Sequence, residues 1–308
     1  MKMKFLFAAL IFPFIANAQR PDTLGVARRV DSLNQVSYGL ASKSKYPEAI
    51  VVSEAAEQLA MEKIGKESAE YARAHFYHSV VLQNMNKYAE AEAYLLDVKS
   101  LQERLISHEH PDYATTLYQL GTNYYYRGNF PAALTNMSTA HQIREKVLEK
   151  DHQRYGESLY FLAFLLRRTR DPEGAEPLLL EYVVFNEKKY GKTHFEYARS
   201  LSDLALLYAN DKAEYKKAEA YQIEALSIME KTVGKLNATY ALTLNYLGAL
   251  YLKTGEYEKA EPLLLEALAI QKKVNAKIRQ QAITFDNLGV VYTALGNYDR
   301  VRLQSDVH

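Results

Sequence analysis

The 308-residue sequence contains no cysteine. Disulfide bridges, thiolate nucleophiles, zinc–thiolate sites and lipidated cysteines are therefore excluded. The sequence also lacks an excess of charge of either sign, because 38 lysines and arginines face 37 acidic residues, for a formal net charge of +1. A nucleic-acid-binding protein normally carries a strongly basic surface, so this balance argues against nucleic acid as a partner.

One apolar run stands at the amino terminus, over residues 5–15. Lys2 and Lys4 precede it and Ala16-Asn17-Ala18 follows it, which is the pattern of a secretory signal peptide. The run is shorter than the roughly 20 residues that span a bilayer. We expect residues 1–18 to be a signal peptide cleaved after Ala18, with export to the periplasm or the extracellular space and no stable membrane anchor. The alternative is a buried core segment.

The remaining sequence repeats with a period of about 42 residues. Expected turns fall near residues 46, 88, 130, 172, 215, 257 and 298. An alanine follows the first six of these by three residues: Ala49, Ala91, Ala133, Ala175, Ala218 and Ala260. A second series, mostly tyrosine, marks the other half of the repeat: Tyr71, Tyr113, Tyr155, Tyr197 and Tyr240. A third series is of small residues: Ser79, Gly121, Ala163, Ala205, Gly248 and Gly289.

Each repeat is predicted to form two helices. Leu244, Leu247, Gly248 and Tyr251 lie at helical spacing on one stripe, and Gly255 suits a left-handed helix terminator, as do Gly128 and Gly296. The second helix opens near Tyr257, and its small residues let the two backbones approach closely. Pro47 and Pro131 fit a first helical turn, whereas Pro177 and Pro262 lie deeper and predict a small local distortion.

The combination Leu247-Gly248-x-x-Tyr251 with Ala260 and Leu264 resembles the tetratricopeptide repeat, whose usual period is 34 residues. The longer period and junctions such as His110-Pro111-Asp112-Tyr113-Ala114 resemble the variant found in kinesin light chain and in many bacterial proteins. The resemblance implies an all-α fold, a right-handed α-solenoid of about six and a half helix-turn-helix repeats over residues 23–298. A short linker, residues 19–22, would precede it.

The last repeat departs from this pattern. After Tyr298 the sequence does not repeat the apolar spacing of a second helix, so we expect residues 299–308 to be a truncated tail. In bacterial relatives such arrays often precede a caspase-like CHAT protease domain or a sensor kinase domain. The chain is therefore also consistent with the recognition arm of a larger protease or signalling protein.

The sequence shows no catalytic constellation. His108-Glu109-His110 lacks the spacing of a zinc protease motif, and His110 recurs as His152 and His194, which predicts a role at the loop junction. The glycines are spread one per turn rather than gathered in a phosphate-binding loop. We expect no catalytic, metal-binding or cofactor-binding residues.

The resemblance implies a concave groove lined mainly by the first helix of each repeat. Residues flanking the apolar stripe are the candidate groove residues: Tyr118, Thr122, Tyr125, Tyr126, Tyr160, Arg167, Arg168, Arg199, Asn245 and Lys253. Tyrosine and arginine are enriched at binding hot spots, and Arg167-Arg168 could hold an acidic segment or a C-terminal carboxylate. The alternative is that these are ordinary exposed helix residues.

Three functions remain open at this stage. The favoured one is an exported, non-catalytic scaffold that binds a protein or peptide in its groove. The second is the recognition arm described above. The third is an envelope enzyme, glycosidase-like, that uses only His, Glu and Asp, although no pair of carboxylates stands out.

Overall fold

The computed structural model describes residues 23–297, which form thirteen α-helices joined by short turns. The described residues contain no β-strand, so the expected all-α class is confirmed. The chain divides into two compact units, with the boundary between Ile106 and Ser107. The predicted signal peptide, the linker, the turn at Tyr298 and the tail lie outside the described residues.

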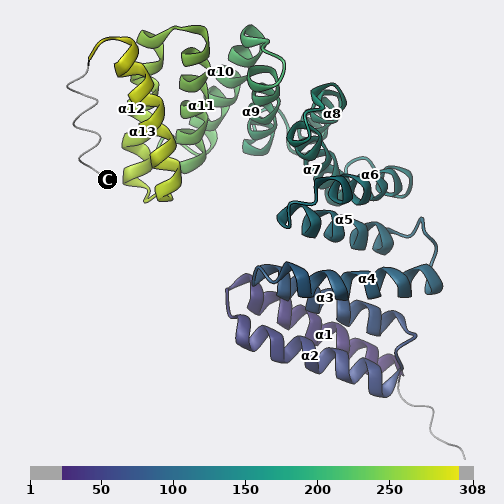
Figure 1. The fold of residues 1–308 in the computed structure, drawn as a ribbon. Helices are drawn as coiled ribbons and strands as arrows, with labels where there is room; N and C mark the ends of the chain where they lie inside the picture. The colour runs from purple at the N-terminus through teal and green to yellow at the C-terminus, as the bar shows by residue number, and fades with distance from the viewer. Residues whose placement is uncertain (1–22, 298–308) are drawn as a thin grey trace, which may run out of the picture. The chain divides into compact units, whose positions relative to one another are not determined.

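The N-terminal unit contains two helix pairs (Figure 1). Its helices are α1 (Thr23–Ser42), α2 (Tyr46–Lys63), α3 (Ala69–Asn84) and α4 (Tyr88–Leu105). Helix α1 packs against α2 and α3, and α3 packs against α4. One shared core contains buried Val30 of α1, Ala56 and Ala60 of α2, and Leu101 of α4.

The C-terminal unit contains four further pairs and one additional helix (Figure 1). Its helices are α5 (Pro111–Tyr126), α6 (Phe130–Val147), α7 (Gln153–Arg168), α8 (Pro172–Tyr190), α9 (Phe195–Asn210), α10 (Tyr215–Thr232), α11 (Ala238–Thr254), α12 (Tyr257–Lys273) and α13 (Ile278–Ala294). Each helix packs against the next, and α11 also contacts α9 and α13. We call α5, α7, α9, α11 and α13 the first helices of this unit, and α6, α8, α10 and α12 its second helices.

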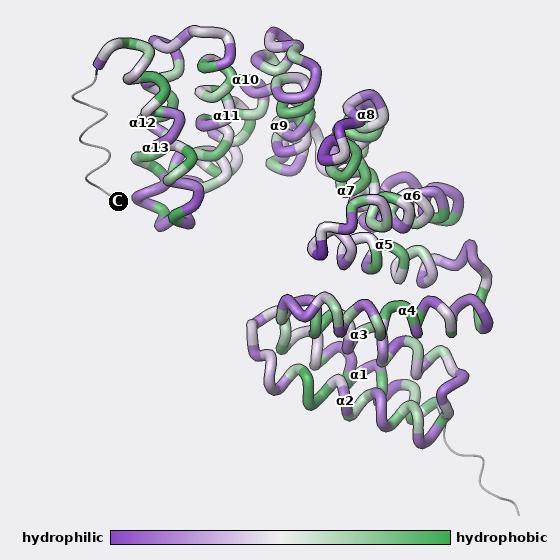
Figure 2. Tube along the Cα trace, in the orientation of Figure 1, coloured by the Kyte–Doolittle hydropathy of each residue, from purple (hydrophilic) through white to green (hydrophobic). Residues whose placement is uncertain are grey.

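Small residues occupy the helix crossings. The alanine that recurs three residues after each turn, at the start of the second helix of every pair, has 0% exposure in all six cases: Ala49, Ala91, Ala133, Ala175, Ala218 and Ala260. At Gly248 on α11, a Cβ atom would lie 2.7 Å from Cγ of Leu264 on α12, so the Leu264 side chain packs directly over the glycine and leaves no room for a larger residue. Figure 2 shows hydrophobic and hydrophilic residues mixed along each helix, as expected when only one stripe is buried.

The turn inside each of the six pairs, and the turn after α13, contains one residue in the left-handed region, with φ between 55° and 77°. These residues are Ser44, Asn86, Gly128, Arg170, Ala213, Gly255 and Gly296. After Gly255 the amide of Glu256 donates to the carbonyl of Tyr251 at 2.8 Å, which satisfies a carbonyl group of the last turn of α11. The predicted left-handed role of the three glycines is confirmed.

The junction histidines cap the first helices. In His110, His152 and His194, the Nδ1 atom accepts the amide N–H of the residue two positions later, each at 3.1 Å. Asn237 does the same for α11 through its side-chain oxygen, which accepts from Thr239 at 2.8 Å. The predicted role of His110 at the loop junction is therefore confirmed, and it is a structural role.

The prolines fall where a helix tolerates them. Pro47 and Pro131 lie in the first turns of α2 and α6, as expected. Pro177 and Pro262 lie within α8 and α12, and both helices continue through them.

Candidate binding groove

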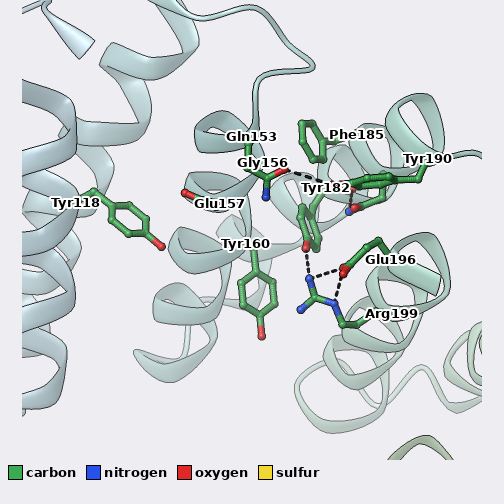
Figure 3. A pocket seen from close by; sticks show the side chains of 11 residues that line it. Tyr118, Gln153, Gly156, Glu157, Tyr160, Tyr182, Phe185, Tyr190, Glu196 and Arg199 are labelled. Atoms are coloured by element: carbon green, nitrogen blue, oxygen red, sulfur yellow. Dashed lines mark hydrogen bonds and ion pairs between the residues drawn. The ribbon is translucent and has the colours of Figure 1, made fainter. Parts of the chain in front are cut away.

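A pocket of about 150 Å³ lies in the C-terminal unit, where the first helices α7 and α9 meet α8. Its lining is mostly aromatic and polar: Tyr118, Gln153, Gly156, Glu157, Tyr160, Tyr182, Phe185, Asn186, Tyr190, Glu196 and Arg199. Figure 3 shows these side chains, with Tyr118 reaching toward α7 from the neighbouring helix α5. Small-molecule and side-chain pockets commonly have this kind of lining.

The pocket depends on one glycine. Gly156 stands where the other repeats carry alanine after the tyrosine, and a Cβ atom there would lie 2.4 Å from the Phe185 ring. Phe185 is buried and stacks on Tyr182, with ring centroids 6.3 Å apart. Tyr182 in turn lies 5.4 Å from the Tyr160 ring, so the aromatic side chains of α7 and α8 form a continuous wall.

Arg199 holds the far side of the pocket. Its guanidinium lies 2.7 Å from the Glu196 carboxylate and donates to the Tyr182 hydroxyl at 2.9 Å (Figure 3). Its hydrogen bonds to the Glu196 carboxylate help raise the pKa of Arg199, whereas burial opposes that rise. The positive charge of Arg199 is therefore already directed at a carboxylate of its own helix.

Arg144 is a fully enclosed cation beneath Tyr118. The arginine is 2% exposed, and its guanidinium lies 4.4 Å from the centre of the Tyr118 ring. It donates to the carbonyl of Arg154 at 2.8 Å. Burial lowers the pKa of Arg144 to about 10, and burial raises the pKa of Tyr118 to about 12. This cation–π contact fixes the Tyr118 ring at the edge of the pocket.

Asp203, on α9, is a carboxyl group with one unpaired oxygen. Its Oδ2 atom is buried and has no hydrogen-bond partner among residues 23–297. Burial raises the pKa of Asp203 to about 6, although Arg199 and Arg167 oppose the rise. The negative charge of Asp203 is the main cause of the raised pKa of Tyr160, and it also raises the pKa of Tyr246.

The structure distributes the candidate groove residues among different environments. Tyr118, Tyr160 and Arg199 line the pocket together. Thr122 donates to the carbonyl of Tyr118 within its own helix. Tyr125 packs into an aromatic cluster that includes Phe161, 5.8 Å away between ring centres.

The other candidates are either paired or away from the pocket. Tyr126 is 58% exposed. Arg167 lies 2.5 Å from the Asp211 carboxylate, and Arg168 lies 5.7 Å from the centre of the Phe130 ring. Asn245 is 2% exposed and accepts a hydrogen bond from Asn287 at 3.1 Å, whereas Lys253 is exposed near the end of α11.

Sequence reasoning missed Asp203, Glu157 and the pocket residues of α8. A signal for Asp203 existed in the repeat register. Gln119, Phe161 and Tyr246 occupy the same position of α5, α7 and α11, so Asp203 is the one carboxylate at this repeat position in these four helices. The residues of α8 gave no such signal, because a second helix was not expected to reach the groove.

The described helices offer no metal centre. His108 stacks on Tyr113, with ring centroids 5.2 Å apart, and His110 caps α5. Among residues 23–297 no three histidine, aspartate or glutamate side chains gather in a way that could hold a metal ion. In the same range no helix is both long and apolar enough to cross a membrane.

Comparison with protein families identifies the repeat. A tetratricopeptide repeat model matches residues 77–137, 112–183, 197–273 and 239–303, which together exceed half of the chain. The chain belongs to the tetratricopeptide repeat family. No curated protein sequence matches it in a sequence search.

Solved structures share the fold at low sequence identity. A tetratricopeptide repeat protein from Parabacteroides merdae aligns with a TM-score of 0.62 and 16% identity, over 90% of this chain and 91% of that one. The nearly identical TPR-like repeats of a putative kinesin light chain from Podosopora anserina give 0.60 and 19%, over 67% and 97%. A Rap protein complexed with Competence and Sporulation Factor gives 0.54 and 12%, over 91% and 96%. The kinesin-light-chain-like solenoid fold expected from the sequence is confirmed.

Proposed function

We propose that this protein is an exported, non-catalytic scaffold that binds an extended segment of a partner protein. The binding surface is the face of α5, α7, α9 and α11 that carries Tyr118, Tyr160, Asp203 and Tyr246; we call it the first-helix surface. The observation that carries the proposal is the pocket together with the unsatisfied Asp203 oxygen beside it. Such a surface contains both an anchor cavity and hydrogen-bonding groups that a partner can complete.

The chemistry of the surface favours binding over catalysis. Tyrosine supplies a large, rigid contact area with a polar tip, and it loses little conformational entropy when a partner binds. The ion pairs of Arg199 and Arg167 hold the surrounding carboxylates in place. The Rap protein, which has a similar fold, was solved in complex with Competence and Sporulation Factor. A helical-repeat protein of this kind can therefore bind a partner.

Affinity capture tests the proposal. The mature protein, from Gln19 onward, is used as bait in an envelope extract, and bound proteins are identified by mass spectrometry. Replacing both Tyr160 and Tyr246 by alanine should remove the specific partner. Ile223→Ala is the matched control, because Ile223 is 50% exposed on the second helix α10. A partner retained by the double variant, or lost equally from the control, would contradict binding at the first-helix surface.

Export is a separate part of the proposal. It is supported by the basic start, the apolar run and the small residues before Ala18. Intact-mass measurement of the protein expressed in a Gram-negative host should show an amino terminus at Gln19 in the periplasmic fraction. A full-length chain confined to the cytoplasm would contradict export and would leave the binding surface to be judged by its own experiment.

A further inference from the structure

The first-helix surface contains a carboxyl group that the described chain does not complete. Asp203 is half-buried, and its Oδ2 atom is shielded from solvent without a hydrogen-bond partner. A carboxylate withdrawn from water without compensation is costly, and such groups are normally paired with a cation or hydrogen-bonded. A group that donates hydrogen bonds and carries positive charge would satisfy this carboxylate.

The neighbouring arginines supply positive charge only in part, because each is bound to another carboxylate. Arg199 is held by Glu196 at 2.7 Å and by the Tyr182 hydroxyl, and Arg167 is held by Asp211 at 2.5 Å. Each arginine is thus committed to another carboxylate. Both arginines lower the pKa of Asp203, but less than burial raises it, so its negative charge is only partly compensated when it is ionised. Glu157 adds a second carboxylate at the wall of the pocket.

Two tyrosines flank Asp203 on adjacent first helices. Tyr160 comes from α7 and Tyr246 from α11. The negative charge of Asp203 contributes to the raised pKa of both phenols. Neither phenol is engaged in a hydrogen bond within the described part of the chain. An aromatic face stabilises a cation placed over it, and a carboxylate adds a charge-assisted hydrogen bond. Asp203, Tyr160 and Tyr246 lie on the first helices α9, α7 and α11 of the first-helix surface, and we call these three residues the Asp203 subsite.

We propose that the Asp203 subsite binds a lysine or arginine side chain of the partner segment, with the ammonium or guanidinium group donating to the Asp203 carboxylate between the rings of Tyr160 and Tyr246. This inference rests on the proposed function, and it specifies the partner as basic at this point of the groove. The aliphatic stem of such a side chain would lie against the aromatic wall beside the pocket.

The subsite should also respond to pH. The groups that face Asp203 are Tyr160 and Arg167 from α7, Arg199 and Glu196 from α9, and Tyr246 from α11. Burial raises the pKa of Asp203 to about 6, so the carboxyl group is ionised at pH 7.5 and largely protonated at pH 5. A cation is attracted only to the ionised form. Binding should therefore weaken on acidification.

Selection from a phage library of random nine-residue peptides tests the subsite, with the full mature protein as the target. Peptides enriched by the wild-type protein should share a lysine or arginine at one position. Asp203→Asn should remove that preference, because asparagine has the same shape but no charge. Asp151→Asn is the matched control, since Asp151 is an exposed residue of the turn between α6 and α7.

One enriched peptide is then measured by fluorescence anisotropy, together with the version in which its basic residue is glutamine. The Asp203→Asn substitution and the peptide substitution should each weaken binding by about tenfold, and the two together by little more than either alone. Wild-type affinity should fall between pH 7.5 and pH 5, and the affinity of the Asp203→Asn variant should stay nearly constant.

The failures of the two proposals are distinguishable. Enriched peptides that lack a basic position, or that are acidic, would overturn the subsite and leave the groove as a binding surface. A basic preference unchanged in the Asp203→Asn variant would also overturn the subsite. If the wild-type protein enriches no peptide, both the subsite and the proposed peptide-binding function are wrong.

Discussion

Asp203 illustrates, at the scale of a single residue, how a binding surface can be kept at a cost in stability. Burial in the folded protein raises the pKa of this carboxyl group from its ordinary value of 3.8 to about 6. The folded state therefore binds the proton more tightly than the unfolded state does. The associated stability is present below pH 3.8 and is lost as the pH rises through 6.

Removing this charge should stabilise the protein at neutral pH. Asp203→Asn is expected to raise the free energy of unfolding by about 1–3 kcal/mol at pH 7.5, because it removes the buried, only partly compensated carboxylate. Below pH 4 the difference from the wild type should vanish, since both side chains are then neutral. Urea denaturation at both pH values measures this. A variant less stable at pH 7.5, or a difference independent of pH, would show that Asp203 is satisfied in the folded protein.

Gly248 and Gly289 occupy the same position of their repeats, but we expect replacement by alanine to change the stability of the protein in opposite directions. Gly248→Ala should destabilise the protein by about 1–3 kcal/mol, because its Cβ atom would lie 2.7 Å from Cγ of the buried Leu264. Gly289→Ala should stabilise α13 by about 0.5–1 kcal/mol, because nothing lies within 4 Å of its Cβ position and alanine favours a helix. Thermal melts of both variants provide the comparison. Equal shifts of the two melting temperatures would contradict the proposed close crossing at Gly248.

At the scale of the helix, the repeat sequence determines where elements begin. The second helices start at the predicted positions from Tyr46 to Tyr257, because the turn before each contains a left-handed residue and the alanine three positions later is buried. Helices α3, α5, α7, α9 and α11 begin after a polar residue whose side chain accepts a hydrogen bond from the first turn, and this residue recurs with the same period. These signals are local, so a single sequence is sufficient to find them.

The contribution of the capping hydrogen bond to stability can be measured separately from the contribution of the histidine ring. His152→Asn retains a side-chain acceptor for the Arg154 amide, whereas His152→Ala removes it. We expect the alanine variant to be less stable than the asparagine variant by about 1 kcal/mol. Chemical denaturation of the two variants gives the difference directly. If they are equally stable, the hydrogen bond at His152 does not contribute to the stability of α7.

The candidate groove was harder to predict than the helices, because its chemistry depends on contacts between repeats. The sequence favoured Arg167 as a carboxylate receptor, but Asp211, 44 positions later, already occupies its guanidinium. Asn245 was expected at the surface, but it is buried and accepts a hydrogen bond from Asn287 on α13. Pairings of this kind depend on which repeats face each other in space, and a residue's own position within its repeat does not encode them.

At the scale of the molecule, each compact unit is stabilised by contacts between neighbouring helices rather than by a single central core. An array of this kind exposes a long, regular surface, and substitutions on that surface alter binding without removing the contacts that hold the helices together. In the C-terminal unit the pocket and the Asp203 subsite interrupt this regularity. The tetratricopeptide repeat thus provides the framework, and under the proposed function the side chains that differ between repeats would provide the specificity.

Photo-cross-linking in cells that express the full-length sequence tests whether a partner binds at the first-helix surface. The photoreactive residue p-benzoylphenylalanine replaces Tyr246 on the first-helix surface or, in a second strain, Ile223 on α10, and cross-linked products are identified by mass spectrometry after irradiation. We expect a discrete adduct with a partner protein when the photoreactive residue replaces Tyr246, and no adduct when it replaces Ile223. Adducts formed only from the position of Ile223, or from neither position, would contradict the claim that this protein binds its partner through the first-helix surface.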